Sequence, residues 1–171
     1  LYDEAETVSL IKKIVGVAKP GAFMNIAYEG VKEIVDVEEK ILLETFARYG
    51  AEDLGSEYGE KWWKEKITFF YPGHMMDLPQ MFGTMDTIAP YDKIEKIYWE
   101  MKKAIETNFP QAKFIAHFSH WYEWGCMIYD RFIVDGDKVP QDPHEAFRLH
   151  QAIWNCGVRT ALANGGVVND P

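Results

Sequence analysis

The chain has 171 residues, of which 47% are hydrophobic and 26% are charged, and its formal net charge at pH 7 is −9. This composition is that of a globular domain and excludes a disordered chain, while the absence of any run of about 18 apolar residues excludes a transmembrane helix. The acidic balance, without a basic stripe, argues against a protein that binds a nucleic acid backbone.

The first half of the chain predicts two helices, one strand and a long irregular segment. A helix is expected from Glu4 to Ala18, and a short apolar strand from Ala22 to Tyr28. Apolar residues then recur at a spacing of three to four from Val31 to Tyr49, which predicts an amphipathic helix. The segment Gly50 to Phe82 breaks this alternation, and we interpret it as an insertion with short helices that carries function.

The second half predicts a regular alternation of strands and helices. Thr84 to Ile88 is a strand candidate, and helical periodicity follows from Tyr91 to Asn108. Lys113 to Trp121 and Cys126 to Val134 are typical of a hairpin, because a four-residue turn with a glycine separates them.

The last predicted helix follows Asp142-Pro143, which supply an N-cap residue and a proline at the first helical position. Gly165-Gly166 end this helix. The order of elements predicts an α+β fold, with an antiparallel sheet and helices on one of its faces, of ferredoxin-like character.

Three common types of site are not expected. The sequence has no Gly-rich phosphate loop, so it lacks an element that binds the body of a dinucleotide. Cys126 and Cys156 are too few for a disulfide framework or a zinc site. They are interpreted as buried thiols in a reducing compartment, which favours a cytoplasmic protein. His117 and His120 lie three residues apart, so on a regular strand they point to opposite faces, and a metal shared by both would need a bulge.

The second strand of the hairpin carries candidate acid–base chemistry. Tyr129 and Arg131 share one face of it, and a guanidinium next to a phenol favours the phenolate and can hold an anionic substrate. One pairing of the two strands brings His120 to this face, and a slip of one residue brings His117 there instead. Either histidine could exchange a proton with the tyrosine. Spacing alone leaves an ordinary sheet surface as the alternative.

The hairpin also carries a pattern that resembles a known family: His117-x-Ser119-His120-x-Tyr122-x-x-Gly125-x-x-x-Tyr129. It is similar to the substrate domain of FAD-linked oxidases of the vanillyl-alcohol oxidase type, and among them most to the alkyldihydroxyacetonephosphate synthases. Further stretches that resemble this family are Leu1-Tyr2-Asp3, Gly59-x-x-Trp62, Gly83 to Asp92 and Leu162 to Gly166. The resemblance therefore extends from one end of the chain to the other.

The resemblance implies a substrate-binding cap domain, residues 1–171 with the insertion at about 50–82, which closes over an FAD held by a separate N-terminal domain. It implies that Tyr129 is the acid/base and that His120 belongs to its proton network. The residues expected at the substrate are Arg131, Tyr122, His117, Trp62 and Lys66. Asn169 and Asp170, which precede the position of the family's His-rich motif, are expected near the cofactor.

The expected function is that of an FAD-dependent oxidoreductase, or a synthase-type transferase, whose cap binds a small-molecule or lipid-like substrate. Because the flavin domain and the His-rich motif lie outside the chain, the chain alone is expected to be inactive. One alternative is an FAD-linked D-2-hydroxy-acid dehydrogenase of the lactate or glycolate type, with a metal bound through His117 or His120. Another alternative is a stand-alone α+β binding module that forms a homodimer through its sheet.

Overall fold

The computed structural model describes residues 24–65 and 80–170 of the chain. The chain divides into two compact units, Leu1–His74 and Met75–Pro171. The predicted helix at Glu4 to Ala18 lies outside the described residues. Within the described residues, no helix is long and apolar enough to cross a membrane.

The first unit contains two described helices, α2 (Lys32–Arg48) and α3 (Glu57–Glu65). α2 confirms the helix predicted there, and α3 is a short helix in the predicted insertion. The apolar side chains of α2 are not buried, and Ile34 and Ile41 are more than half exposed. The strand predicted at Ala22 to Tyr28 is wrong for its described residues: they have no regular structure and are mostly exposed, because no described strand pairs with their backbone groups.

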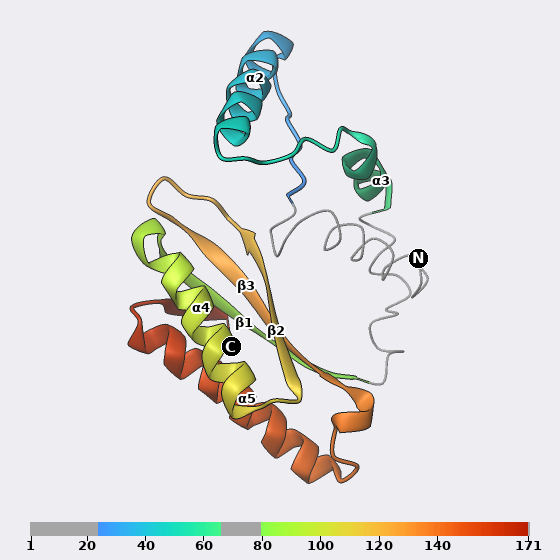
Figure 1. Ribbon diagram of the computed structural model, residues 1–171, viewed down its shortest axis with the longest axis vertical. Helices are drawn as coiled ribbons and strands as arrows, with labels where there is room; N and C mark the ends of the chain where they lie inside the picture. Colours follow the sequence, from blue (N-terminus) through green and yellow to red (C-terminus); the bar gives the residue numbers. More distant parts are fainter. Residues whose placement is uncertain (1–23, 66–79, 171) are drawn as a thin grey trace. The chain divides into compact units, whose positions relative to one another are not determined.

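The second unit is an antiparallel sheet covered on one face by two helices (Figure 1). Its elements in chain order are β1 (Gln80–Pro90), α4 (Tyr91–Asn108), β2 (Ala112–Ser119), β3 (Gly125–Asp135), the 3-10 helix η3 (Gly136–Lys138), α5 (Pro143–Ala163) and β4 (Val167–Asp170). The strand order across the sheet is β2-β3-β1-β4. This arrangement confirms the predicted α+β fold of ferredoxin-like character.

The strands have other ends than predicted: β1 extends beyond Thr84 to Ile88 on both sides, and β2 ends at Ser119 and not at Trp121. β1 begins at Gln80, so the sheet starts two residues before the predicted end of the insertion. β4 follows Gly165-Gly166 directly and was not predicted, since its four residues pair with only three positions of β1 and are too few to show a period. The predicted helices α4 and α5 and the β2–β3 hairpin are confirmed.

The predicted capping signal at the start of α5 works as expected. One side-chain oxygen of Asp142 accepts hydrogen bonds from the backbone N–H groups of His144, at 2.9 Å, and Glu145, at 3.0 Å. Pro143 occupies the first helical position, where its missing N–H costs nothing. The cap therefore stabilises the first turn of α5, and the later turns of this helix pack against the sheet.

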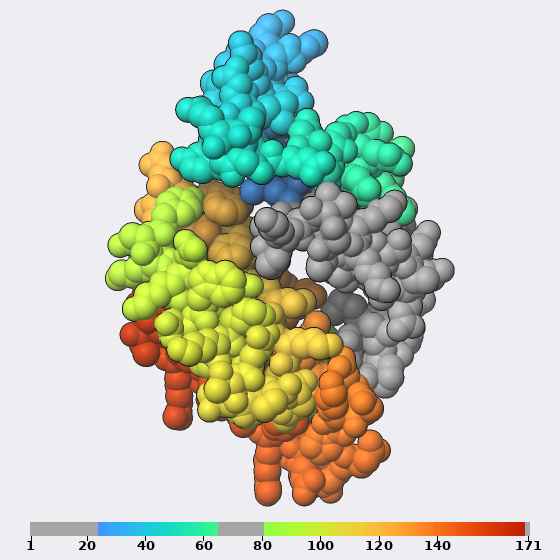
Figure 2. Space-filling model, in the orientation of Figure 1, coloured from blue at the N-terminus to red at the C-terminus, as the bar shows by residue number. Residues whose placement is uncertain are grey.

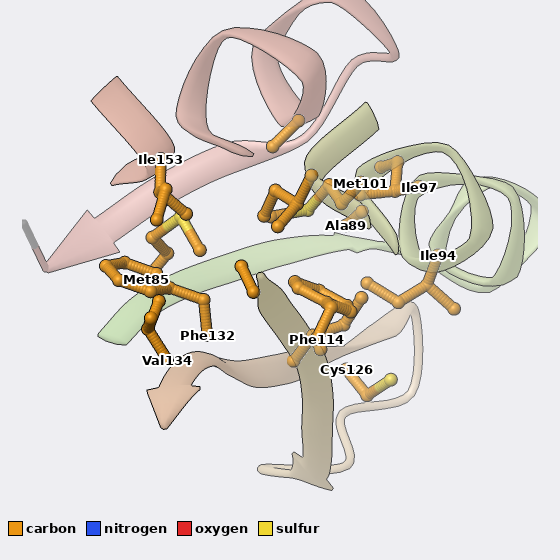
Figure 3. Close-up of a cluster of buried hydrophobic side chains, with 14 residues drawn as sticks. Met85, Ala89, Ile94, Ile97, Met101, Phe114, Cys126, Phe132, Val134 and Ile153 are labelled. Atoms are coloured by element: carbon orange, nitrogen blue, oxygen red, sulfur yellow. The ribbon is translucent and has the colours of Figure 1, made fainter. Parts of the chain in front are cut away.

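The hydrophobic core lies between the sheet and the two helices (Figure 3). Ile97, Met101 and Ile105 of α4 are fully buried, and the outward side of this helix faces the viewer in the space-filling view (Figure 2). Full burial of such a side chain is worth about 1.5–3 kcal/mol. α5 comes close to β1 because Gly157 has no side chain: a Cβ atom there would lie 2.5 Å from the Met85 sulfur.

The outer edge of β2 is satisfied by side chains of α4. The backbone N–H of Phe114 donates to Oε1 of Glu106 at 3.1 Å, and the carbonyl of Phe114 accepts from Nζ of Lys102 at 3.2 Å. These contacts show that the even-numbered residues of β2 direct their backbone groups away from β3.

Side chains of α5 satisfy backbone carbonyl groups in the first part of β1, where β4 does not pair with this strand. The carbonyl of Phe82 accepts from Nε2 of His150 at 3.2 Å, and the carbonyl of Thr84 accepts from Nε1 of Trp154 at 3.1 Å. The even-numbered residues of β1 therefore direct their backbone groups away from β3.

Candidate functional site

The two faces of β3 differ as predicted. Residues such as Phe132 point toward the helices and are fully buried, whereas Tyr129 and Arg131 lie on the opposite face and are partly exposed. α4 and α5 leave this second face of the sheet uncovered (Figure 1). We call it the open face, and it carries the candidate site.

The pairing of β2 with β3 decides which histidine joins Tyr129. His117 is the direct partner of Tyr129 in the register of these two antiparallel strands. His120 lies beyond the end of β2, where its φ is 51° and its Nδ1 is 2.9 Å from the hydroxyl of Ser119. The structure thus brings His117 to the open face beside Tyr129 and leaves His120 in the exposed hairpin loop.

On its other side Tyr129 pairs with a carboxylate that the sequence did not single out. Asp86 of β1 is its direct partner. Because even-numbered residues of β1 direct their backbone groups away from β3, this pair has no backbone hydrogen bonds between its members. In such pairs the side chains approach most closely. His117, Tyr129 and Asp86 therefore form one row across three strands, which we call the titratable row.

Arg131 lies one residue pair further along the open face. The central carbon of its guanidinium is 4.7 Å from the centre of the Tyr129 ring, a cation–π contact. Its Nε is buried and finds no hydrogen-bond acceptor among the residues that the structure describes. A buried donor without a partner costs free energy, so this atom favours a bound group that supplies an acceptor.

Directly behind the open face, the same strand carries a carboxyl group inside the core. Asp130 is fully buried, and its Oδ2 accepts a hydrogen bond from the hydroxyl of Thr87 at 3.2 Å. Burial raises the pKa of Asp130 to about 8, the bond from Thr87 opposes the rise, and the charge of Asp86 adds to it. Asp130 therefore holds its proton at neutral pH.

Two further predicted site residues belong to other elements, Tyr122 to the hairpin loop and Trp62 to α3. The ring of Tyr122 in the hairpin loop stacks on Trp124, with centroids 5.6 Å apart, and its backbone carbonyl accepts from the hydroxyl of Tyr91 at 2.6 Å. Trp62 belongs to α3 in the first unit, with its ring centroid 6.3 Å from that of Trp63. The predicted residue Lys66 lies outside the described residues.

The predicted cofactor residues belong to β4. Asp170 pairs with Asp86 in the β1–β4 register, so this strand ends beside the titratable row. Asn169 is exposed. This placement agrees with a role near the site, and the role itself stays a prediction.

A metal site and a groove beside β1 are the alternatives to the titratable row. Across the two described segments, no group of three or more His, Cys, Asp or Glu side chains could hold a metal ion. A groove of about 470 Å³ at the outer edge of β1 is lined by Phe82, Gly83, Thr84, His150, Gln151 and Trp154. It is not the better candidate, because its histidine and tryptophan already donate to the strand edge.

Comparison with known proteins supports the resemblance seen in the hairpin. Alkyldihydroxyacetonephosphate synthase of Dictyostelium discoideum is 23% identical over 133 residues, which cover 72% of this chain and 22% of that protein. The chain is similar to this synthase. No family model matches the chain.

Solved structures give the same result for the fold. One structure of alkyldihydroxyacetonephosphate synthase superimposes with a TM-score of 0.68 at 19% identity, over 96% of this chain and 30% of that chain. A second gives a TM-score of 0.56 at 16% identity, over 82% and 25%. The chain therefore spans less than a third of the length of the proteins that it matches here.

Asp86 is the site residue that the sequence analysis missed. A signal for it exists, since a carboxylate alternates with the buried Met85 and Thr87 in a stretch of strand character. That pattern places Asp86 on the open face but does not say what lies beside it. Its neighbour Tyr129 is 43 residues away and is found only from the strand pairing.

Proposed function

We propose that this chain is the substrate-binding cap domain of an FAD-dependent enzyme that resembles alkyldihydroxyacetonephosphate synthase. The titratable row of His117, Tyr129 and Asp86, with Arg131 packed on the tyrosine, is the observation that carries the proposal. The similarity to that synthase in sequence and fold supports it. The FAD-binding domain of the same protein is then the partner of this chain.

The residues of the open face fit the isoalloxazine ring of FAD better than its dinucleotide part. The sequence has no phosphate-binding Gly-rich loop for a pyrophosphate, so another domain would hold the dinucleotide. The unpartnered Nε of Arg131 is a donor for a carbonyl or anionic group at the ring or the substrate. When bound, the flavin supplies the electron acceptor, and this chain supplies acid–base groups and substrate contacts.

Each residue of the open face has a chemical task in this proposal. Tyr129 takes a proton from the substrate at its phenolic oxygen, or returns one. Arg131 binds an anionic group of the substrate, such as the phosphate of a compound like alkyldihydroxyacetonephosphate. The guanidinium lies 4.7 Å from the centre of the tyrosine ring, so the anionic group and the reacting atom belong to neighbouring parts of the substrate. His120 and Tyr122 are proposed to line the entrance from the hairpin loop.

The proposal is tested on the full-length protein that contains this chain. We expect the purified protein to show the visible absorption spectrum of a bound flavin. Its anaerobic reduction is then followed with a panel of substrates, comprising long-chain derivatives of dihydroxyacetone phosphate, D-lactate and glycolate. With the substrate that reduces the flavin, Tyr129→Phe should slow reduction by about 100-fold or more, as expected for loss of an acid–base group.

The matched control is Tyr98→Phe, which removes a phenolic hydroxyl from α4 and not from the open face. It should leave the rate of flavin reduction unchanged. A full-length protein without flavin would refute the proposed function. Equal rates for the wild type and Tyr129→Phe would refute the role of the tyrosine.

A further inference from the structure

A buried hydrogen bond crosses directly behind the titratable row. Thr87 of β1 pairs with Ile128, one residue pair to one side of the row, and Asp130 of β3 pairs with Met85, one pair to the other side. The hydroxyl of Thr87 nevertheless donates to Oδ2 of Asp130 at 3.2 Å. This diagonal bond joins β1 and β3 on the helix-facing side of the sheet, at the level of Tyr129.

The Thr87–Asp130 pair is polar, whereas the core around it is apolar. Both residues are fully buried, and their strand neighbours Met85 and Ile128 belong to the hydrophobic core. Oδ1 of Asp130 has no hydrogen-bond partner among the residues that the structure describes. A buried polar atom without a partner lowers stability, and a pair of apolar side chains is often at least as stable as a buried polar pair. Stability therefore does not account for these two residues.

The polar pair specifies how β1 and β3 align. A slip of one residue in β3 would turn Tyr129 into the core and Asp130 to the open face. In the observed register Asp130 reaches Thr87, and Tyr129 lies on the open face with Arg131 over its ring. The Asp86–Tyr129 pair has no backbone hydrogen bonds between its members, so the bond behind it adds a link between the strands at this level.

We infer that Thr87 and Asp130 are positioning residues, whose hydrogen bond holds β1 and β3 in the alignment that places Tyr129 at the substrate. Both lie on the helix-facing side of the sheet, so they act through Tyr129 and not by touching the substrate. A misplacement of the tyrosine by about 1 Å would be enough to slow its proton transfer by about 100-fold. This inference rests on the proposed function of the open face.

The test removes the hydrogen bond in the full-length protein. Thr87→Val deletes the hydroxyl with little change of shape, and Thr87→Ser retains it. At saturating substrate without oxygen, Thr87→Val should reduce the flavin at least about 10-fold more slowly than the wild type, and Thr87→Ser should stay within about 2-fold. Thr160→Val is the matched control, because it removes a hydroxyl that donates to the carbonyl of Cys156 within α5, at 2.8 Å. Its rate should equal that of the wild type.

A double variant separates positioning from stability. Thr87→Val/Asp130→Val replaces both polar groups by β-branched apolar side chains, which suit a buried strand. Its midpoint in chemical denaturation should equal or exceed that of the wild type, since no unpartnered polar atom remains at these two positions. Its rate of flavin reduction should still be at least about 10-fold lower. A pair that served stability alone would let the rate recover with the midpoint.

Amide exchange reports the link between the strands without substrate or flavin. The segment Ile128 to Arg131 in the full-length protein is followed by hydrogen–deuterium exchange. Loss of the bond makes local opening of the strands easier, so exchange in Thr87→Val should be about 10-fold faster than in Thr160→Val. Thr87→Ser should exchange as slowly as the wild type.

The outcomes separate this inference from the proposed function. A rate of flavin reduction in Thr87→Val or in the double variant that equals the wild-type rate overturns the inference, whatever the exchange shows. If Thr87→Val fails to fold, as judged by circular dichroism, the double variant decides. A full-length protein without flavin refutes the proposed function; exchange then decides alone, and equal exchange in Thr87→Val and Thr160→Val overturns the link between the strands.

Discussion

The two faces of β3 have different tasks although their residues alternate one by one. Toward the helices, residues such as Ile128 and Phe132 are fully buried and hold α4 and α5 on the sheet. On the open face, Tyr129 and Arg131 form a cation–π pair and are only partly buried. In the proposed function, one strand therefore separates stability from chemistry by the direction of its side chains.

The largest effect is expected from truncation on the helix-facing side. Phe132 is fully buried and its ring meets that of His150 edge-on, with centroids 5.1 Å apart. Phe132→Ala leaves a cavity and should lower the free energy of unfolding by about 3–5 kcal/mol in chemical denaturation. Ile133→Ala, the neighbour on the open face, should cost clearly less. Equal losses would mean that the two faces contribute alike to stability.

A second test uses the buried carboxyl group on the helix-facing side of β3. Asp130 ionises at its ordinary value of 3.8 in the unfolded chain, but burial raises its pKa to about 8 in the folded protein. Between pH 3.8 and about pH 8 the folded state therefore binds one more proton than the unfolded chain does. The contribution of Asp130 to the free energy of unfolding is greatest below pH 3.8 and falls as the pH rises toward 8. The slope is about 1.4 kcal/mol per pH unit, so about 3 kcal/mol should be lost from pH 5 to pH 7.

Replacing this carboxyl group should remove the dependence. Asp130→Asn keeps the shape without the ionisation, and its free energy of unfolding should vary little across the same range in urea denaturation. Asp135→Asn serves as the control, because that carboxylate is bound by Lys113 and Lys138 at the end of the strand and its pKa is lowered. If the wild type and Asp130→Asn lose stability in parallel, the buried carboxyl is not the cause.

The smallest effect on stability is expected on the open face itself. His117 is exposed, so His117→Gln should change the free energy of unfolding by no more than about 0.5 kcal/mol. Thermal or chemical denaturation measures this, and flavin reduction in the full-length protein measures the effect on chemistry. A loss of stability above 1 kcal/mol would show that the titratable row also supports the fold.

Local patterns were sufficient for most elements of the second unit. The period of α4 and the turn signal of the β2–β3 hairpin are visible within short windows of sequence, and the structure confirms both. The register of that hairpin was left open, because its loop permits two pairings that differ by one residue. Only the observed pairing selects His117 over His120.

Features that depend on distant contacts could not be predicted. The neighbourhood of Asp86 and Tyr129 results from the pairing of β1 with β3, across an intervening helix and strand. β4 has only four residues and is recognised as a strand by its pairing with β1. In α2 the sequence showed an apolar stripe, but a stripe says nothing about which surface covers it, and the structure leaves Ile34 exposed.

The side chains that α4 places on β2 and that α5 places on the first part of β1 also limit how copies of this domain can associate. Free edges of a sheet act as templates for strands of other molecules, and this is the first step of β-type aggregation. Here an incoming strand would have to displace Lys102 and Glu106 from β2, or His150 and Trp154 from the first part of β1. β2 and the first part of β1 are thus closed to growth of the sheet, while α4 and α5 leave the other face of the described strands uncovered.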